Sequence, residues 1–401
     1  MKIVLTGDLH LGCTSTRIPE EWRQSCRTVQ AWQSLVDAVI EAKADLLLLS
    51  GDILDRRNQL WEAMGPLQQG IERLSQAGVR CLAVSGNHDA SSLPDLASQF
   101  PEETFLLLGK DGKWQRETLC VDGHPVLHVD GWSFPASVVR NDPTLDYPES
   151  SAQDGIPVLA MVHGDPGVPD SKYAPLSLSR LQSLPVSAWL LGHIHRSAYT
   201  EGSPWILMPG SPHPLDPGEP GAHHAWVCDL SEGRLSPPLP FCPARLQYAA
   251  LKITISSEET ASAELLRNKI QQAVEEHLTA AMNLIRLQLN GQSAEIDAWQ
   301  ECAENLKDWS PENFRIEKVE FSIHPLLDLE EVAKAGPVPE LLVNALEELP
   351  QDLLDRLNDL CDSLNRQTVF SGKELNPLEL SDLPLTRLLE QNLRKTLEQL
   401  K

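Results

Sequence analysis

The stretch Ile3-Val4-Leu5-Thr6-Gly7-Asp8-Leu9-His10 is a short apolar run that ends in a glycine and two potential metal ligands. Four further motifs also stand at the ends of apolar runs of strand length. The full set is Gly7-Asp8-Leu9-His10, Gly51-Asp52, Gly86-Asn87-His88-Asp89, His163-Gly164-Asp165 and Gly192-His193-Ile194-His195. The carboxyl ends of parallel strands meet at one rim of a sheet, where α/β proteins bind their ligands. The sequence therefore predicts an α/β fold that gathers these five motifs at one site.

The chain up to about residue 240 contains alternating strand and helix patterns. Buried strands are expected at 3–5, 46–50 and 80–85, and helices at 29–44 and 66–76, with Pro66 in the first turn. This series predicts a parallel or mixed sheet with helices on its faces. A more β-rich half follows, with strands expected at 117–122, 125–129, 157–162, 188–191, 205–208 and 225–230. Two sheets packed face to face, with helices outside, account for both halves.

Changes in the pattern divide the chain into three regions. Residues 1–240 form the first domain, and the proline-rich segment 236–243 is interpreted as a linker. Residues 247–335 are expected to form a small α+β domain, with strands at 247–256, 283–290 and 315–324 and helices at 261–281 and 294–309. Residues 338–401 carry Leu at helical spacing among many Asp and Glu, which predicts short amphipathic helices. These helices are too few for a core of their own, so we expect them to bind a partner or to dimerise.

The composition is that of a globular protein, but the charge is strongly negative. The chain has 401 residues, 41% of them apolar, and a formal net charge of −24. A protein that holds DNA phosphates by itself needs a basic surface, so either the substrate is small or a partner supplies the positive charge. We expect a cytoplasmic protein, because the sequence has no signal-peptide pattern and no apolar run near the ~20 residues of a membrane span. The eight cysteines lie far apart, unlike those of a zinc ribbon.

The five motifs carry side chains suited to two divalent metal ions. Carboxylate, imidazole and amide groups are hard or borderline ligands, and a two-metal site needs one carboxylate that both ions share. Asp52 is the expected bridge, while Asp8 and His10 can share one ion because residues two apart in an extended chain point the same way. The remaining ligand positions are assigned to Asn87, His163, His193 and His195.

Two neighbouring residues are expected to act on the substrate. His88 directly follows Asn87, so its side chain projects differently and suits a proton donor to the leaving oxygen. Asp89 is expected to orient the His88 imidazole. Arg196 could contact a phosphate, and His213 could border the substrate, although each also fits an ordinary structural role.

This set of motifs resembles the calcineurin-like metallophosphoesterase superfamily. Within that superfamily, Gly-Asp-Leu-His-Leu-Gly at 7–12, Gly-Asp-Ile-Leu-Asp at 51–55 and the tail after His195 are similar to the SbcD/Mre-eleven group of DNA-repair exonucleases. The resemblance covers roughly residues 1–230 and implies a four-layer αββα sandwich, with the α+β segment as a capping domain and a helical C-terminus. It implies one metal at Asp8, His10, Asp52 and His195, a second at Asp52, Asn87, His163 and His193, and His88 as the catalytic histidine.

The resemblance also implies a function and partners. It implies an exonuclease or endonuclease that uses two Mn²⁺ ions to hydrolyse DNA phosphodiesters in DNA repair. A homodimer is implied, together with an SMC-like ATPase whose coiled coils bind the C-terminal helices. Asp55 departs from the pattern, because some family members carry a histidine three residues beyond the bridging aspartate. Two alternatives stay open: a phosphodiesterase or phosphatase for nucleotides or sugar phosphates, and a non-catalytic metal-binding interaction subunit.

Overall fold

The computed structural model describes residues 1–55, 60–148 and 154–326, together with residues 334, 336 and 356. These residues fall into two compact units. One comprises 1–255, 260–291 and 297–322, and the other comprises 256–259, 292–296 and the described residues from 323 onward. The predicted C-terminal helices at 338–401 lie outside the described residues, apart from residue 356.

A seven-stranded mixed sheet forms the first layer of strands. Its order is β14-β13-β1-β2-β3-β4, and β15 also pairs with β13. The strands β1 to β4 run parallel, whereas β13 runs antiparallel to β1. The bounds are β1 Lys2–Thr6, β2 Leu46–Leu49, β3 Arg80–Ala83, β4 Phe105–Leu107, β13 His224–Ser231, β14 Arg234–Leu235 and β15 Leu239–Pro243. The expected strands at 3–5, 46–50 and 80–85 are therefore confirmed.

A six-stranded sheet forms the second layer, in the order β11-β12-β10-β7-β6-β5. Its bounds are β5 Gln115–Val121, β6 His124–Trp132, β7 Val158–His163, β10 Ala188–Gly192, β11 Ala198–Thr200 and β12 Trp205–Met208. The central strands β6, β7, β10 and β12 are parallel to their neighbours in this set. A short pair, β8 Asp165–Pro166 with β9 Pro175–Leu176, follows the end of β7.

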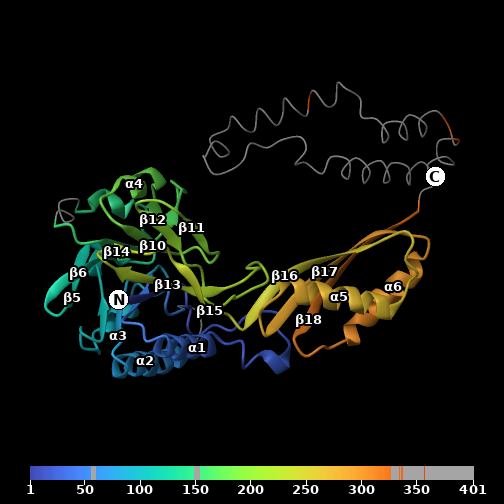
Figure 1. Cartoon of the computed structure of the whole chain (residues 1–401), viewed down its shortest axis with the longest axis horizontal. Coiled ribbons are helices and arrows are strands. Elements are labelled where there is room, and N and C mark those ends of the chain that lie inside the picture. The colour runs from blue at the N-terminus through green and yellow to red at the C-terminus, as the bar shows by residue number, and fades with distance from the viewer. Residues whose placement is uncertain (56–59, 149–153, 327–333, 335, 337–355, 357–401) are drawn as a thin grey trace. The chain divides into compact units, whose positions relative to one another are not determined.

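The two sheets pack face to face, with helices on both outer faces (Figure 1). One apolar core lies between the sheets and includes Leu5, Leu48, Leu159 and Leu190. This arrangement arises because alternate residues of each strand point to opposite faces, so a strand that is apolar on both faces can serve two cores. Leu47, for example, faces away from the inter-sheet core and packs against a helix layer. The predicted α/β sandwich with four layers is confirmed.

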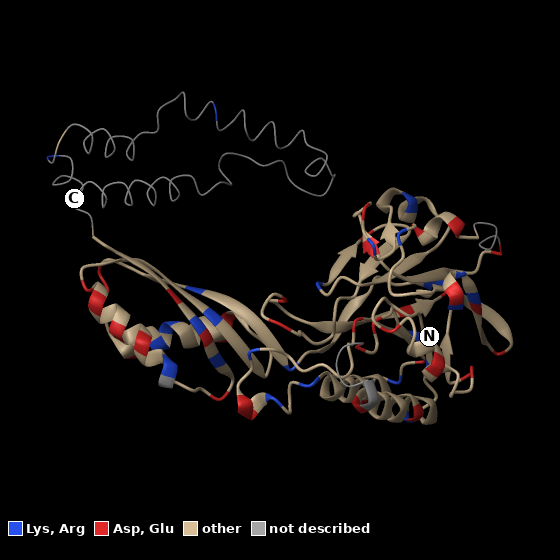
Figure 2. Ribbon diagram, turned by 180° about the vertical axis from the view of Figure 1, so that it is seen from behind, with Lys and Arg blue, Asp and Glu red and all other residues tan. Residues whose placement is uncertain are grey.

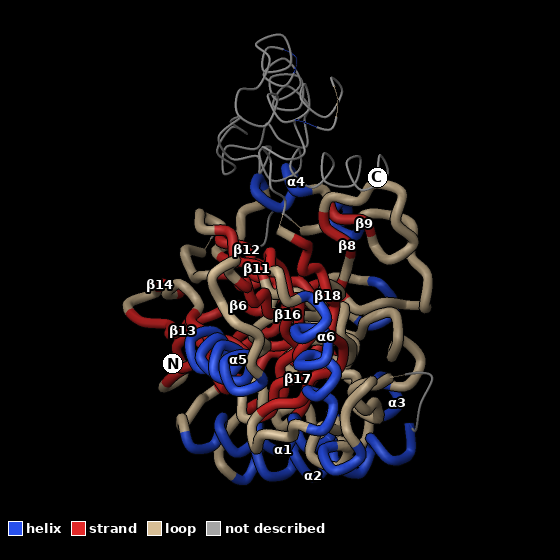
Figure 3. Tube along the Cα trace, turned by 90° about the vertical axis from the view of Figure 1, so that its right-hand side faces the viewer, coloured by secondary structure: helices blue, strands red, loops and turns tan. Residues whose placement is uncertain are grey.

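The helix layer on the first sheet consists mainly of α1 (Thr28–Glu41) and α2 (Leu60–Gln76), which lie side by side (Figure 3). Trp32 of α1 is buried here and donates an Nε1–H hydrogen bond of 3.1 Å to the carbonyl of Pro66. The predicted start of α2 at residue 66 is wrong, since the helix already runs from Leu60 and Pro66 lies in its interior. The short α3 (Leu93–Ala97) joins this layer, and α4 (Leu178–Ser183) covers the second sheet.

The predicted linker at 236–243 is also wrong in its second half. Leu239–Pro243 forms strand β15, which pairs antiparallel with β13 and places Pro240 opposite Trp226. Proline cannot donate a ladder hydrogen bond, so it is tolerated in a strand only at an edge. The high proline content of residues 236–243 therefore suggested a flexible linker, but in the fold residues 239–243 form an edge strand that contains proline.

The following segment forms a three-stranded sheet, here called the cap sheet, in the order β16-β17-β18. Its strands are β16 Leu246–Ile255, β17 Met282–Ser293 and β18 Phe314–Pro325, and its helices are α5 Ala263–His277 and α6 Ile296–Glu304. Apolar contacts join the start of this sheet to the segment 18–26, where Trp22 and Cys26 pack with Tyr248 and Leu284. The predicted strands and helices of this region are confirmed within a few residues at each end. In the part of the chain that the structure describes, no helix has both the length and the apolar composition needed to cross a bilayer.

Candidate metal centre

The five motifs meet where strands of the two sheets end. Asp8 and His10 follow β1, Asp52 follows β2, and Asn87 follows β3 in the first sheet. His163 is the last residue of β7, and His193 follows the last residue of β10 in the second sheet. Three groups of potential ligands have their ligand atoms within 4.8 Å of one another: Asp8, His10 and His195; Asp52, His163 and His193; and His10, Asp55 and His88.

The first group gathers side chains from both sheets. His10 Nε2 lies 3.0 Å from His195 Nε2, and His195 Nε2 lies 3.9 Å from Asp8 Oδ1. Two imidazole nitrogens that face each other so closely next to a carboxylate are arranged to share a cation. Both Asp8 carboxylate oxygens also accept the backbone N–H of His193 at 3.1 Å, which links the ends of β1 and β10.

The second group surrounds Asp52 and includes an amide. His163 Nε2 lies 3.3 Å from Asp52 Oδ2 and 3.2 Å from Asn87 Oδ1. The His193 ring lies against the His163 ring, with 5.2 Å between their centroids. Asp52 Oδ2 also lies 3.9 Å from His10 Nε2, so this carboxylate touches both groups. That is the position expected for a bridging ligand.

The centre is buried, and its charges depend on one another. Asp8, Asp52 and His163 are at most 2% exposed. Burial raises the pKa of Asp8, whereas for Asp52 the neighbouring His163 imidazole outweighs burial and lowers the pKa. Burial alone would lower the pKa of His163, but Asp52 and Asp8 raise it to about 9. Buried carboxylates need compensating positive charge, and among the described residues the groups that lower the pKa of Asp8 and Asp52 are imidazoles.

The donor set fits two divalent cations. Carboxylate and amide oxygens with imidazole nitrogens suit Mn²⁺, Zn²⁺ or Fe²⁺, and a shared carboxylate holds two ions close together. The candidate residues for one ion are Asp8, His10, Asp52 and His195, and those for the other are Asp52, Asn87, His163 and His193. Each set contains residues that follow strands of the first sheet and at least one residue from the second sheet. The site therefore forms only when the two sheets are packed together.

Close backbone approach at two glycines allows this convergence. A Cβ on Gly192 would collide with the backbone carbonyl of Ser50 and with His163 Nδ1. A Cβ on Gly86 would collide with the Asp52 carboxylate and backbone N–H. Any side chain at either position would push the ligand-bearing loops apart.

His88 contacts a carboxylate other than the one predicted. Its Nδ1 lies 3.4 Å from Asp55 Oδ2, and this contact raises the pKa of His88. The same Asp55 oxygen lies 3.5 Å from His10 Nδ1. Asp89 instead accepts backbone N–H groups from Gly86 at 2.7 Å, Ile53 at 2.7 Å and Leu54 at 3.3 Å. Asp89 thus ties two ligand loops together, and Asp55 is the carboxylate beside the His88 ring.

Oxygen acceptors outside the ligand groups hold the outward nitrogens of two histidines. His163 Nδ1 lies 3.0 Å from the Ser50 carbonyl, and His195 Nδ1 lies 2.6 Å from Glu219 Oε1. Sequence reasoning missed both Asp55 and Glu219. Asp55 was visible in the Gly-Asp-Ile-Leu-Asp motif, but Glu219 lies in a proline-rich loop with no local pattern that singles it out.

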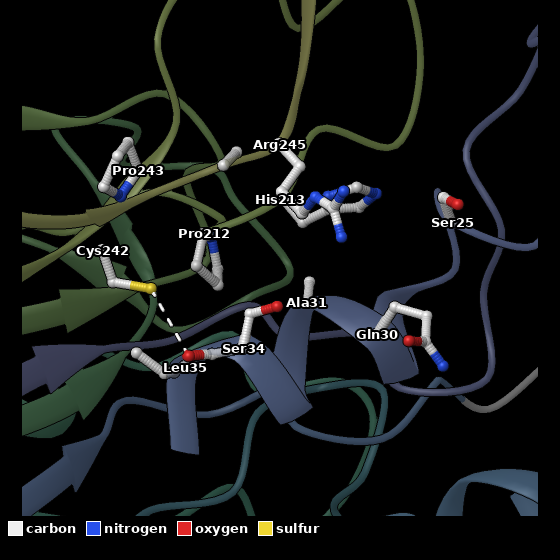
Figure 4. A pocket seen from close by; sticks show the side chains of 11 residues that line it. Ser25, Gln30, Ala31, Ser34, Leu35, Pro212, His213, Cys242, Pro243 and Arg245 are labelled. Atoms are coloured by element: carbon white, nitrogen blue, oxygen red, sulfur yellow. Dashed lines mark hydrogen bonds between the residues drawn. The ribbon is translucent and has the colours of Figure 1, made fainter. Parts of the chain in front are cut away.

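The other histidine that the sequence placed near the substrate lies elsewhere. His213 is 4% exposed, and its Nε2 lies 3.1 Å from the Cys26 carbonyl and 2.9 Å from Ser15 Oγ. It lines a small pocket with Arg245 and residues of α1 (Figure 4). His213 is therefore a buried packing residue of the loop that follows β12.

Residues 1–197 match the family model described as calcineurin-like phosphoesterase. The chain is 23% identical over 244 residues to an uncharacterized metallophosphoesterase, YhaO, of Bacillus subtilis, which covers 59% of each chain. It is 23% identical over 317 residues to the DNA double-strand break repair protein Mre11 of Methanosarcina mazei, covering 76% of this chain and 48% of that protein. The Haloferax volcanii protein of the same name is 33% identical over 91 residues, which are 22% of this chain and 20% of the relative. The matched segments thus span about three fifths or less of each curated relative.

Two solved structures are also similar. They are TT1561 of Thermus thermophilus and a dimetal phosphatase from Danio rerio. Each is 15% identical to this chain, with a TM-score of 0.37, and the match covers 60% of this chain and 98% of the other.

Proposed function

We propose that this metal-dependent phosphoesterase, whose residues 1–197 match the calcineurin-like phosphoesterase model, is a nuclease that hydrolyses DNA phosphodiesters with two Mn²⁺ ions. The two ligand groups that share Asp52 carry the chemical part of the proposal. Support for DNA as the substrate comes from the alignment with the Methanosarcina protein. It covers 76% of this chain, more than the catalytic segment alone.

The chain's own residues would act as a rigid cradle for a phosphodiester. Two divalent ions bound there would neutralise phosphate charge and lower the pKa of a water molecule. Asp8 and Asp52 are fixed by the backbone N–H groups of His193 and His88, the latter at 2.8 Å. Their oxygens therefore need no rearrangement when the substrate binds, which favours catalysis by preorganisation.

His88 is the residue that we assign to the leaving oxygen. The Asp55 carboxylate 3.4 Å from Nδ1 raises the pKa of His88 and so favours the protonated ring, and Nε2 is then the nitrogen assigned to donate a proton to the departing oxygen. We assign Asp55 as the positioning residue for this ring, and Asp89 as a brace for the loops at 53–54 and 86. Both assignments use contacts that exist before substrate binds.

A small-molecule phosphodiesterase or phosphatase is the second candidate. The net charge of −24 favours it, because a polyanionic DNA strand would be repelled by the acidic surface. A nucleotide or sugar phosphate carries fewer charges and meets less of this repulsion. The cap sheet favours the nuclease, because hydrolysis of a small substrate gives this additional sheet no evident role.

Digestion of linear duplex DNA in the presence of Mn²⁺ separates these candidates. We expect the wild-type chain to shorten or cut DNA, and His88→Ala to lose roughly 10²- to 10⁴-fold in rate, the usual contribution of general acid catalysis. His124→Ala removes an exposed histidine of β6 and serves as the matched control, with unchanged activity. Hydrolysis of mononucleotides alone would support the second candidate. Mn²⁺ binding without any phosphoester turnover would support a non-catalytic interaction subunit.

The remaining parts of the proposal concern assembly and location. We propose the division into a phosphoesterase domain at 1–240, a capping domain at 247–335 and a helical partner-binding region at 338–401. An SMC-like coiled-coil ATPase would supply DNA-binding charge, the chain would act as a homodimer, and the complex would work in DNA repair in the cytoplasm. Co-purification of the full chain with such an ATPase, lost on truncation at residue 337, tests the partner assignment.

A further inference from the structure

The two ring nitrogens of His195 face opposite environments. Nε2 faces the ligand group, 3.0 Å from His10 Nε2, whereas Nδ1 faces Glu219 Oε1 at 2.6 Å. An ionised carboxylate can only accept, so the proton of this contact belongs to Nδ1. The tautomer with Nδ1–H leaves the Nε2 lone pair free for a cation, which is what a metal ligand needs.

Glu219 is itself held in place by its second oxygen. Oε2 accepts the backbone N–H of Leu215 at 2.7 Å, so the carboxylate spans from the loop backbone to the imidazole. The Leu215 carbonyl accepts the N–H of Thr16 at 2.8 Å, and the Thr16 carbonyl accepts the Tyr248 hydroxyl at 2.6 Å. Gly221 N–H donates to the Tyr248 carbonyl at 2.9 Å on the other side of Glu219. The loop around Glu219 is therefore anchored to β16 at both ends.

We propose that Glu219 is a positioning residue that sets the tautomer and orientation of His195 and thereby the affinity of the metal position formed by Asp8, His10, Asp52 and His195. This inference rests on the two-metal centre of the proposed function. His163 gives the structural comparison, because its Nδ1 contacts the Ser50 carbonyl, a neutral backbone group that cannot be mutated away. A charged side chain performs the same task at His195. The two metal positions therefore differ in how their ligand histidines are supported: His195 Nδ1 contacts a side-chain carboxylate, whereas His163 Nδ1 contacts a backbone carbonyl.

The Glu219→Gln substitution keeps the size of the side chain but removes its charge and one of its two acceptor oxygens. A glutamine has one carbonyl oxygen, so it can accept from His195 Nδ1 or from Leu215 N–H, but not from both. Either orientation turns an amide N–H toward another donor. Glu219→Ala removes both contacts and leaves the Leu215 N–H without its acceptor.

Mn²⁺ titration of the full chain, followed by calorimetry and electron paramagnetic resonance, tests the proposal without relying on turnover. We expect wild type to bind two Mn²⁺ ions and to give the signal of a spin-coupled pair. Glu219→Ala and Glu219→Gln should weaken one of the two ions by roughly 10- to 100-fold, the usual effect of losing a partner of a ligand histidine. When Mn²⁺ is added in an amount equal to the number of metal positions, the variants should show the resonance signal of a single Mn²⁺ ion. Wild type should show the signal of the spin-coupled pair under the same conditions.

Asp154→Asn is the matched control. It neutralises another carboxylate that contacts an imidazole, since Asp154 Oδ2 lies 2.8 Å from His128 Nε2. His128 pairs with Val158 at the start of β7, the end of that strand opposite His163. The Mn²⁺ affinity of Asp154→Asn should equal that of wild type. Unfolding by urea in the presence of a chelator shows whether the Glu219 variants keep the fold of the metal-free chain.

Three results would overturn the proposal. Two Mn²⁺ ions bound with wild-type affinity by both Glu219 variants would show that His195 needs no partner. Equal weakening of both ions, together with a less stable metal-free chain, would show a general structural role of the loop. Absence of a Mn²⁺ pair in the wild-type chain would overturn the two-metal centre as well, whereas a wild-type pair with unaffected variants overturns the role of Glu219 alone.

Discussion

Four residues of the candidate metal centre have left-handed backbone conformations. Asp8, His10, Asp52 and His193 have φ values of 50°, 42°, 48° and 96°. Such a conformation costs a side chain on the order of 1–3 kcal/mol and persists only where the surroundings impose it. Here the turns hold one another, since Asp8 N–H donates to the Gly51 carbonyl at 2.9 Å and His10 N–H donates to the Asp52 carbonyl at 3.0 Å. Positive φ values also occur outside the centre, for example at Lys43 and Asp111, so the feature that distinguishes these turns is that they hydrogen-bond to one another.

His213 should make the stability of the chain sensitive to acid. Burial lowers its pKa to about 4, while the unfolded chain has the ordinary value of 6.5. The unfolded state therefore takes up a proton as the pH falls below 6.5, but the folded state does not, and folding stability is lost over that range. We expect wild type to lose about 2 kcal/mol more than His213→Gln between pH 7 and pH 5. Urea unfolding of both proteins in a chelator, at these two pH values, measures the difference.

The same urea unfolding experiment can also contradict the prediction for His213. His213→Gln keeps a polar group near the Cys26 carbonyl but does not titrate. Equal losses in the two proteins would mean that the His213 ring becomes protonated within the fold. Any acid sensitivity common to both proteins then belongs to other groups, such as His193, whose pKa burial lowers to about 3.

Among the elements, strand ends were the most predictable feature of the sequence. An apolar run of four to six residues followed by Gly-Asp or Gly-His identified β1, β2 and β10. Because a parallel strand delivers its carboxyl end to a known rim, the same pattern also predicted that these side chains lie close together, while their role as metal ligands stays a prediction. The prediction that these side chains meet needs only the direction of each strand and the identity of its neighbours in the sheet. The alternation of strands and helices along the sequence constrains both.

Contacts made by loops were not predictable in this way. Glu219 reaches His195 because the loop at 209–224 returns to the segment after β10, where Ser211 N–H donates to the His195 carbonyl at 3.0 Å, and Asp55 reaches His88 across two strand ends. No local periodicity encodes such contacts. Proline also misled the assignment of elements, since Pro66 lies inside α2 and Pro240 lies in edge strand β15. In both places packing, to Trp32 and to β13, outweighs the local preference of proline.

Gly192→Ala should show how tightly the two sheets must approach at the centre. A Cβ there would meet the Ser50 carbonyl and His163 Nδ1, so we expect the free energy of unfolding to fall by about 1–3 kcal/mol. Mn²⁺ affinity should fall with it, because His163 is displaced. Gly123→Ala is the control, since its Cβ meets nothing within 4 Å although its φ is +78°. This variant should lose about 1 kcal/mol from backbone strain alone and bind Mn²⁺ normally. Normal Mn²⁺ binding by Gly192→Ala would contradict the role of close sheet contact.

For the molecule as a whole, the acidic charge limits how DNA could be held. Figure 2 shows Lys and Arg interspersed with Asp and Glu on the cap sheet and its helices. Within the described residues, carboxylates engage two cations of the cap sheet and also Arg17, which precedes α1. Arg286 Nε lies 2.6 Å from Glu317, Arg17 lies 2.9 Å from the same carboxylate, and Lys318 lies 2.7 Å from Glu320. Basic groups that are already paired attract phosphates weakly, because binding must first break or share the ion pair.

The isolated chain should therefore bind duplex DNA poorly, even if it cleaves it. Each DNA phosphate that a Lys or Arg neutralises releases counterions. The slope of log K against log salt concentration therefore becomes steeper by about 0.9 for each phosphate contact. With a net charge of −24 we expect a shallow slope, corresponding to roughly two or three phosphates, and no binding tighter than about 10⁻⁵ M at physiological salt. Fluorescence anisotropy of a labelled duplex, titrated with the slow His88→Ala chain at several salt concentrations, measures both quantities. A steep slope with nanomolar affinity would show that the chain carries its own DNA-binding surface, and the need for a partner that supplies positive charge would then disappear.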